Sequence, residues 1–392
     1  MERVTTKRMA LYSGRTHLAL AEEIAEHLGI ELGDPNLVEF SSGEYRPRFT
    51  ESVRGTDVFI MQTHYGCDGR SVNDSIMEQL IMIDAAYRAS AKRITAVCPF
   101  YGYARQDRKA EGREPITARL VADLFKAAGA KRMVSVDLHS GQIQGFFDGP
   151  VDHLTAIPVL EGYIRDHCEP GVVVVAPDAG RVKVAERFAQ HLGDLDADLA
   201  FINKRRPKGM ANVAVAREVI GDVAGRHCVI TDDMIDTAST IASAAEILLE
   251  RGATEVWAMA THGVLSGPAV DRLKNAPIAR VVITNTLPLP PEKQLDKLEV
   301  LSVAPILAAE NLADAGVVED GGHYGSPAAR VARAGEGPAW GCRRSSMSPS
   351  ASSWSGSCSR SPSQGSTRRS PGSPACGRSS SGGRWQASWT RR

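Results

Sequence analysis

One segment of the 392-residue chain combines residue types suited to binding a phosphorylated sugar. Residues 228–231 form a short apolar run that predicts a strand, and two adjacent carboxylates, Asp232 and Asp233, follow at its end. A third acid, Asp236, opens a run of small residues that leads into an amphipathic helix. Carboxylates accept hydrogen bonds from vicinal hydroxyls or hold a cation, and backbone N–H groups at a helix start bind phosphate. The segment therefore indicates a site for a phosphorylated compound that carries hydroxyl groups.

An interpretation without chemistry is also open for this segment. Paired Asp residues at a strand end often form a solvated turn, and Asp236 would then act as the helix N-cap. The segment resembles, however, the ribose-5-phosphate loop of the phosphoribosyltransferase fold. That resemblance implies that Asp232 and Asp233 contact the ribose hydroxyls. It also implies that the 5-phosphate is surrounded by Asp236, Thr237, Ala238, Ser239 and Thr240.

A second segment, residues 99–109, joins aromatic and basic side chains directly after a predicted strand at 94–98. Aromatic rings can stack on a purine, and Arg105, Arg108 and Lys109 can meet phosphates. The alternative is a solvated basic turn. The run Tyr-Gly-Tyr-Ala-Arg-Gln-Asp-Arg-Lys resembles the same run in bacterial ribose-phosphate pyrophosphokinases, also called phosphoribosyl pyrophosphate synthetases. The resemblance implies that Arg105 and Gln106 bind ATP.

The resemblance to this family extends from about residue 7 to about residue 310. The run Phe-Ser-Ser-Gly-Glu at 40–44 is similar to a family loop that contacts adenine across a subunit boundary, which implies ATP contacts from Ser42, Gly43 and Glu44. Ser42 stands where the family has Asp. Ser239 stands where the family usually has Gly, so its Cβ can strain a loop that needs positive φ, or its hydroxyl can add a phosphate contact.

The same family implies a magnesium ion and a catalytic loop. His139 and Asp178 match positions that hold Mg²⁺, although by residue type alone they indicate a structural histidine and an N-cap. Lys204 and Arg206, in the run Lys-Arg-Arg-Pro, match catalytic positions that meet the transferred group; the alternative is a solvated basic patch. The implied reaction transfers a diphosphoryl group from ATP to the 1-hydroxyl of ribose 5-phosphate, which places the protein among the kinase-class transferases of nucleotide biosynthesis.

Apolar and helical patterns alternate along the chain and predict an α/β protein with mostly parallel sheets flanked by helices. We expect strands at 9–12, 58–62, 94–98, 133–136, 172–176, 200–202, 228–231, 255–261 and 280–284. We expect helices at 17–28, 74–89, 116–128, 157–166, 179–192, 237–250 and 268–274. The resemblance implies two tandem phosphoribosyltransferase-like domains, 1–152 and 153–312. Acidic or His-bearing strand ends in both halves hint at a duplicated fold.

Residues 313–392 have a different composition and are predicted to be a disordered tail. Residues 341–392 are about one-third Ser and contain no Lys, Ile, Leu or Val, so they cannot form a packed core. Two interpretations remain open: an Arg/Ser-rich tail that binds nucleic acid, and an out-of-frame translation of GC-rich sequence, which we favour.

Charge and composition limit the classes of function. Residues 321–392 carry +10, whereas residues 1–320, with 35 basic and 45 acidic residues, carry −10, which argues against general nucleic-acid binding. No apolar run of about 18 residues predicts a membrane span, and the seven cysteines are scattered as expected in the cytoplasm. The family implies a homo-oligomer, with a hexamer expected. A salvage phosphoribosyltransferase and a non-catalytic regulatory subunit remain alternatives.

Overall fold

The computed structural model describes residues 8–205 and 216–315. The chain separates into two compact units, 1–335 and 336–392, and every described residue belongs to the first. Of the predicted tail, 313–392, residues 313–315 belong to a helix, and residues 316–392 lie outside the described residues. Within the described ranges, every helix is too short or too polar to cross a membrane.

The described chain alternates strands and helices, as the sequence predicts. The strands are β1 Met9–Ser13, β2 Leu32–Gly33, β3 Val38–Glu39, β4 Tyr45–Arg46, β5 Asp57–Met61, β6 Arg93–Cys98, β7 Arg132–Val136, β8 Val151–Leu154, β9 Val173–Ala176, β10 Asp198–Arg205, β11 Ala216–Ile220, β12 His227–Ile235, β13 Glu255–Gly263, β14 Arg280–Thr284 and β15 Leu298–Leu301. The α-helices are α1 Leu18–Leu28, α2 Val72–Arg88, α3 Thr117–Ala128, α4 Ile157–His167, α5 Val182–His191, α6 Ser239–Glu250, α7 Ala269–Asn275 and α8 Ala304–Ala315. Short 3₁₀ turns are η1 Gly141–Gly145, η2 Gly193–Leu195 and η3 Pro291–Lys293.

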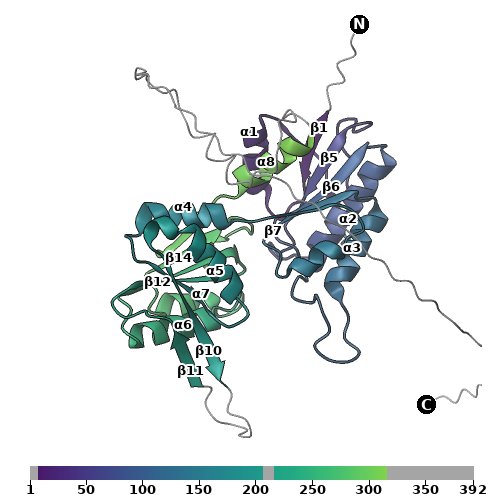
Figure 1. Ribbon diagram of the computed structural model, residues 1–392. Coiled ribbons are helices and arrows are strands. Elements are labelled where there is room, and N and C mark those ends of the chain that lie inside the picture. The colour runs from purple at the N-terminus through teal and green to yellow at the C-terminus, as the bar shows by residue number, and fades with distance from the viewer. Residues whose placement is uncertain (1–7, 206–215, 316–392) are drawn as a thin grey trace, which may run out of the picture. The chain divides into compact units, whose positions relative to one another are not determined.

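The first sheet has six parallel strands in the order β2-β1-β5-β6-β7-β8. Both of its faces are covered, because successive side chains of a strand point to opposite sides. On β5, Val58 and Ile60 pack with α2 and α3, whereas Phe59 and Met61 pack with α1 and α8. The helices on both faces of this sheet are visible in Figure 1.

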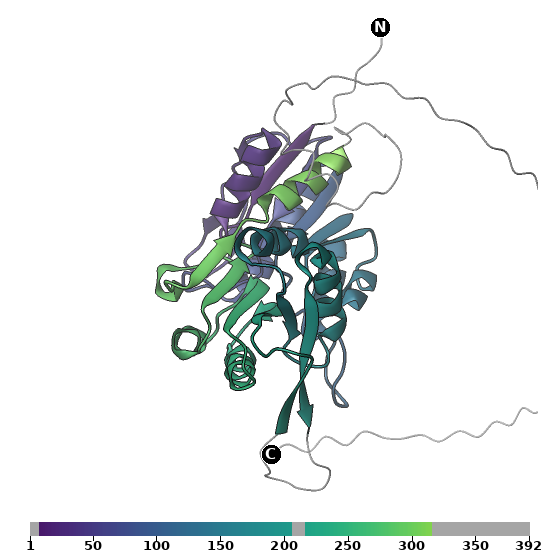
Figure 2. The same cartoon turned by 60° about the vertical axis from the view of Figure 1, so that its left-hand side comes forward.

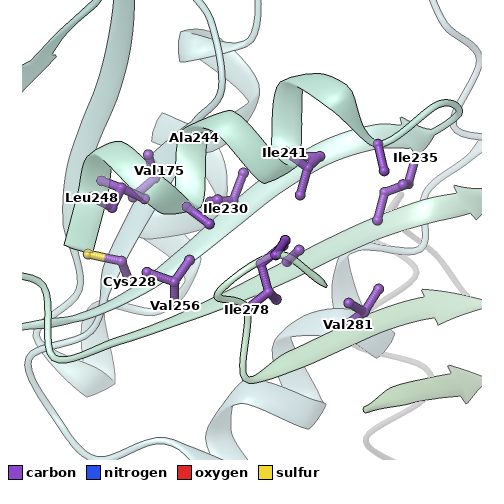
Figure 3. Close-up of a cluster of buried hydrophobic side chains, with 14 of the residues drawn as sticks. Val175, Cys228, Ile230, Ile235, Ile241, Ala244, Leu248, Val256, Ile278 and Val281 are labelled. Carbon is purple, nitrogen blue, oxygen red and sulfur yellow. The ribbon is translucent and has the colours of Figure 1, made fainter. Parts of the chain in front are cut away.

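The second sheet has seven strands in the order β11-β10-β9-β12-β13-β14-β15. All neighbours are parallel except β10 and β11, which form an antiparallel ribbon (Figure 1). Val173 and Val175 of β9 pack in the core beneath α6 and α7, and Val174 packs with α4 and α5 on the other face. Figure 3 shows the α6 side of this core, where Ile241 and Leu248 lie over the strands.

The two sheets share one strand order. With β11 and the separate β3–β4 hairpin set aside, each sheet reads second, first, third, fourth, fifth and sixth strand in chain order. In each sheet the first and third strands of the series are neighbours, and the second strand lies on the other side of the first. This repetition supports the duplicated fold at which the sequence hints.

The last helix of each series packs on the other sheet. Helix α4 follows β8 of the first sheet but packs on the second, where Leu160 and Ile164 are buried. Helix α8 follows β15 of the second sheet, yet Ile306 and Leu307 join the core beside α1 (Figures 1 and 2). The expected domain limit at 152/153 therefore falls inside β8, and residues 304–308, which we expected in the second domain, pack on the first sheet.

The sequence prediction located nine of the described strands and every α-helix up to α7, but missed six strands and the last helix. It did not identify β2, β3, β4, β8, β11, β15 or α8. Most of these are short or lie at sheet edges, where apolar periodicity is brief. The prediction that the strand at 228 ends before the acids was wrong, because β12 continues to Ile235 and pairs with β13 as far as Gly263.

Candidate active site

The acid pair lies at the point where the strand order of the second sheet reverses. Strands β9 and β12 are adjacent, but the chain continues from β9 to β10 on the opposite side. The loops that leave β9 and β12 therefore diverge, and such divergence opens a crevice at the carboxyl edge of a parallel sheet. A cavity of about 640 Å³ lies there. Its lining includes Arg105, His139, Asp178, Asp232, Asp233, Asp236, Thr237, Ala238, Ser239 and Thr240.

The two carboxylates of the acid pair share one arginine that the sequence analysis did not select. The Nε of Arg181 lies 3.0 Å from Asp232 Oδ1, and its Nη2 lies 2.5 Å from Asp233 Oδ1. Burial and the neighbouring Asp233 raise the pKa of Asp232. Burial alone would also raise the pKa of Asp233, but the hydrogen bond from His139 and the charge of Arg181 together lower it. The surroundings of the pair therefore favour the negatively charged form of Asp233.

His139 is oriented by that negative charge. Its Nδ1 lies 2.6 Å from Asp233 Oδ2, so Nδ1–H donates to the carboxylate. This tautomer leaves Nε2 unprotonated and able to bind a metal ion. His139 follows β7 of the first sheet, so the acid pair and its histidine come from different halves of the described chain.

Asp137 fixes the turn that presents His139. Its backbone is left-handed, with φ 38°, and its Oδ2 accepts hydrogen bonds from Ala156 N–H at 2.9 Å and from the Thr261 hydroxyl at 2.6 Å. The ring of His262 donates from Nε2 to the carbonyl of Asp137, at 3.1 Å, while its Nδ1 accepts from Thr286. Burial lowers the pKa of His262, which keeps the ring neutral and suits this bonding. The turn is therefore held by groups from β13 and by the segment before α4.

The small-residue loop between β12 and α6 differs in two ways from expectation. Asp236 is not the N-cap of α6; its carboxylate binds Arg105 at 2.6 Å, and the cap position is Ala238. Ala238 adopts the left-handed conformation with φ 58°, whereas Ser239 begins the helix. The positive φ that we expected at position 239 is thus at 238, and α6 begins at Ser239, two residues after the predicted helix start at 237. The first turn of α6 directs N–H groups toward the cavity, where they suit a phosphate.

The expected nucleotide residues divide into two groups. Arg105 and Gln106 line a second cavity of about 550 Å³, which is also lined by aromatic side chains: Tyr65, Phe100 and Tyr103. Arg105 lines both cavities. Ser42, Gly43 and Glu44 form the exposed turn of the β3–β4 hairpin, where the Ser42 hydroxyl donates to Glu44 at 2.9 Å. Neither cavity is lined by this turn.

The expected catalytic cations lie at the edge of the described chain. Lys204 is on β10, opposite Arg217 of β11, at the outer end of the antiparallel ribbon. Arg206 lies outside the described residues. The backbone thus carries Lys204 on the strand that follows β9, but the position of its side chain relative to the cavity stays a prediction.

The residues present suit a magnesium ion that is held largely by substrate. Among residues 8–205 and 216–315, no group of three or more His, Cys, Asp or Glu side chains forms a ready-made metal site. Mg²⁺ typically takes one or two carboxylates and completes its shell with water and phosphate oxygens. Asp178 and His139 line the same cavity as the acid pair, and the Asp178 carboxylate is held by Gly180 N–H at 2.9 Å. This donor set therefore fits the ion.

The missed residues share a weak sequence signal. Arg181 follows Gly180 in the loop after β9, and Asp137 stands two residues before His139. Both stand at the carboxyl ends of strands, where an α/β site is expected. Residue type alone did not distinguish Arg181 from a helix-start cation, since its two carboxylate partners lie about fifty residues further along the chain.

Fold and site together define an α/β enzyme built from two phosphoribosyltransferase-like sheets, with the acid-pair cavity at the carboxyl edge of the second. A sequence model of the N-terminal domain of ribose phosphate pyrophosphokinase matches residues 9–129, and a model of the phosphoribosyl synthetase-associated domain matches residues 201–313. The chain belongs to the ribose-phosphate pyrophosphokinase family.

Named relatives and a solved structure agree with this membership. The ribose-phosphate pyrophosphokinase of Bifidobacterium longum is 56% identical over 318 residues, which cover 80% of this chain and 91% of the relative. The ribose-phosphate pyrophosphokinase of Mycobacterium tuberculosis is 54% identical over 304 residues, which cover 77% of this chain and 91% of the relative. The crystal structure of phosphoribosylpyrophosphate synthetase from Mycobacterium smegmatis has a TM-score of 0.73 at 51% identity, and the match covers 80% of this chain and all of that one.

Proposed function

We propose that this protein transfers the diphosphoryl group of ATP to the 1-hydroxyl of ribose 5-phosphate, giving 5-phosphoribosyl 1-pyrophosphate and AMP. The observation that carries the proposal is one cavity in which an acid pair, a helix start and Arg105 come together. Family membership supports the same reaction.

Ribose 5-phosphate occupies the β12–α6 side of this cavity. Asp232 and Asp233 accept hydrogen bonds from the ribose hydroxyls, and charge-assisted bonds of this kind are stronger than neutral ones. The loop of residues 236–240 surrounds the 5-phosphate, which meets backbone N–H groups at the start of α6. This arrangement directs the anomeric hydroxyl toward the centre of the cavity.

ATP occupies the side formed by the first half of the chain. The aromatic cavity beside Arg105 suits the purine, and the shared position of Arg105 places its guanidinium between nucleoside and phosphates. Ser42, Gly43 and Glu44 supply adenine contacts to a neighbouring subunit of a homo-oligomer, for which we propose a hexamer. Their exposure and their absence from the lining of both cavities are consistent with that role.

The cofactor is Mg²⁺, which His139 Nε2 and Asp178 help to hold and which neutralises phosphate charge when bound. The protein's own contribution is positioning and charge. Lys204 and Arg206 offset the charge that develops on the transferred group. As a soluble enzyme of nucleotide biosynthesis, the protein acts in the cytoplasm.

The test is AMP formation from ATP that depends on both ribose 5-phosphate and Mg²⁺. Lys204→Ala should lower the turnover number by roughly two to three orders of magnitude with a modest change in ATP affinity. Lys274→Ala, on the exposed side of α7, is the matched control and should retain activity.

Two other results would each point to a different function. Folded protein that releases no AMP would favour a non-catalytic regulatory subunit. Consumption of phosphoribosyl pyrophosphate with a free nucleobase, without AMP release from ATP, would indicate a salvage phosphoribosyltransferase.

A further inference from the structure

Arg181 occupies the part of the active-site cavity where a substrate or metal cation would meet the acid pair. Its guanidinium bridges Asp232 Oδ1 and Asp233 Oδ1, at 3.0 Å and 2.5 Å, from two different nitrogens. The Nη2 atom also lies 3.0 Å from Nδ1 of His139. Arg181 therefore touches both members of the acid pair and the histidine that is hydrogen-bonded to it.

We propose that Arg181 is a built-in counterion of the acid pair, which a divalent cation or the ribose hydroxyls must displace in order to engage Asp232 and Asp233. The identity of the displacing ligands rests on the proposed function. The competition itself does not, because it follows from the charges. Two adjacent carboxylates attract a cation, and the guanidinium already supplies one positive charge at the same oxygens.

Anchoring and exposure allow Arg181 to leave the acid pair without a change of fold. Its backbone is fixed at the N-cap of α5, where its N–H donates to the Asp178 carbonyl at 3.2 Å. The acids lie on β12, so release requires only rotation about side-chain torsions of Arg181. The Arg181 side chain is 19% exposed, compared with 18% for Asp232 and 9% for Asp233, so the contact borders the open cavity rather than the core.

Three other ionisable side chains that line the cavity, Arg105, His139 and Asp178, have partners of their own. Arg105 pairs with Asp236 at 2.6 Å, and His139 donates to the far oxygen of Asp233. Asp178 binds the backbone of its own loop. Among the described residues that line the cavity, Arg181 is thus the cation that bridges the pair. Its removal should increase the attraction of the pair for a free cation.

The experiment measures Mn²⁺ binding by electron paramagnetic resonance, with no ATP and no ribose 5-phosphate present. Arg181→Gln should bind Mn²⁺ at least about tenfold more tightly than the unaltered protein, because one competing charge is lost at short range. Arg181→Lys keeps the charge and should bind nearly as the unaltered protein does. Arg187→Gln, which removes one charge from the exposed side of α5, is the matched control and should leave binding unchanged.

Equal or weaker Mn²⁺ binding in folded Arg181→Gln would overturn the proposal, with folding checked by circular dichroism. Adding Asp233→Asn to Arg181→Gln should abolish the gain. If the gain survives in this double variant, the ion binds elsewhere and the proposal fails. The measurement needs no turnover, so its outcome is separate from that of the AMP-release assay.

Discussion

The two sheets have the same strand order, and each has a crevice where that order reverses. Side chains fill the crevice of the first sheet, whereas the crevice of the second sheet is open. Between β1 and β5 of the first sheet, Glu78 accepts hydrogen bonds from Arg15 N–H at 2.6 Å, from Arg15 Nε at 2.8 Å and from Gln62 Nε2 at 3.0 Å. The Glu78 side chain is only 1% exposed. Between β9 and β12 of the second sheet, Arg181 bridges two acids at the edge of a cavity of about 640 Å³.

The difference comes from which element supplies the acid. Glu78 is the seventh residue of α2, and its long side chain fills the crevice from the helix side. The seventh residue of α6 is Ala245, which is buried in the core and whose side chain is too short to enter the crevice. In the second sheet the acids instead come from β12 on short side chains, which leaves room for a ligand. A duplicated fold can thus hold one structural crevice and one functional crevice, each with an arginine–carboxylate contact.

The largest effect on stability is expected at the closed crevice, which is the crevice between β1 and β5 that Glu78 fills. Glu78→Gln leaves the Arg15 charge without its buried partner and should lower the free energy of unfolding by about 3–5 kcal/mol. Urea denaturation followed by circular dichroism measures this loss. Glu39→Gln, which removes the exposed partner of Arg15, should cost less than about 1 kcal/mol. Similar losses in both variants would mean that the closed crevice is not the structural one.

The next effect is an acid-induced loss of stability at the loop after β5. His64 accepts from Gly102 N–H at 2.9 Å and lies 2.8 Å from Gln79 Oε1, and burial lowers its pKa to about 4. An unfolded histidine takes up a proton near its ordinary pKa of about 6.5. The unfolded state therefore binds more protons between these values. Stability is unaffected above about pH 6.5 and falls as the pH drops toward 4, by roughly 3 kcal/mol in total.

Urea denaturation at pH 7 and pH 5 tests the role of His64. His64→Gln removes the titrating ring, so the variant should lose less stability between the two pH values than the unaltered protein. The buried His262 is present in both proteins and its contribution cancels. An identical pH dependence in both proteins would assign the effect to other groups.

At the open crevice, which lies between β9 and β12, the expected effect is on activity rather than on folding. Asp233→Asn removes the charge that orients His139 and that we propose accepts hydrogen bonds from the ribose hydroxyls, so kcat/KM should fall about 100-fold, equivalent to about 2.7 kcal/mol. Its urea midpoint should change less than that of Glu78→Gln, since Arg181 keeps Asp232 as a partner. Asp271→Asn on α7 is the matched control. A large stability loss with unchanged kcat/KM would reverse the assignment of the two crevices.

The smallest effect concerns the loop between β12 and α6, for which we propose phosphate binding. Ala238 has φ 58°, which an L-residue adopts at a cost, so Ala238→Gly should leave stability equal or raise it by up to about 1 kcal/mol. Ser239→Gly places glycine in the first turn of α6 and should give no gain. The midpoints of thermal unfolding of both variants show which substitution raises stability more. A larger gain from Ser239→Gly would contradict the placement of the strained residue at 238.

Sequence patterns were sufficient for the long elements and for the loops that carry chemistry. Apolar runs located β5, β6, β9 and β13, because the strands of a parallel sheet are buried on both faces and lack a solvated side. The motifs also identified the acid pair, His139 and Asp178, all of which line one cavity. The buried strands and the acid pair are local features that neighbouring residue types predict, whereas His139 and Asp178 were selected only through the resemblance to the family.

Several features depended on partners far along the chain. The extension of β12 through Asp232 and Asp233 comes from pairing with β13, and the exchange of α4 and α8 between the sheets reflects which apolar face each helix meets. The sequence by itself determined which residues carry charge at strand ends. Only the tertiary structure decided that Arg15 closes one crevice and Arg181 guards the other, because an ion pair depends on distances between segments that local periodicity does not encode.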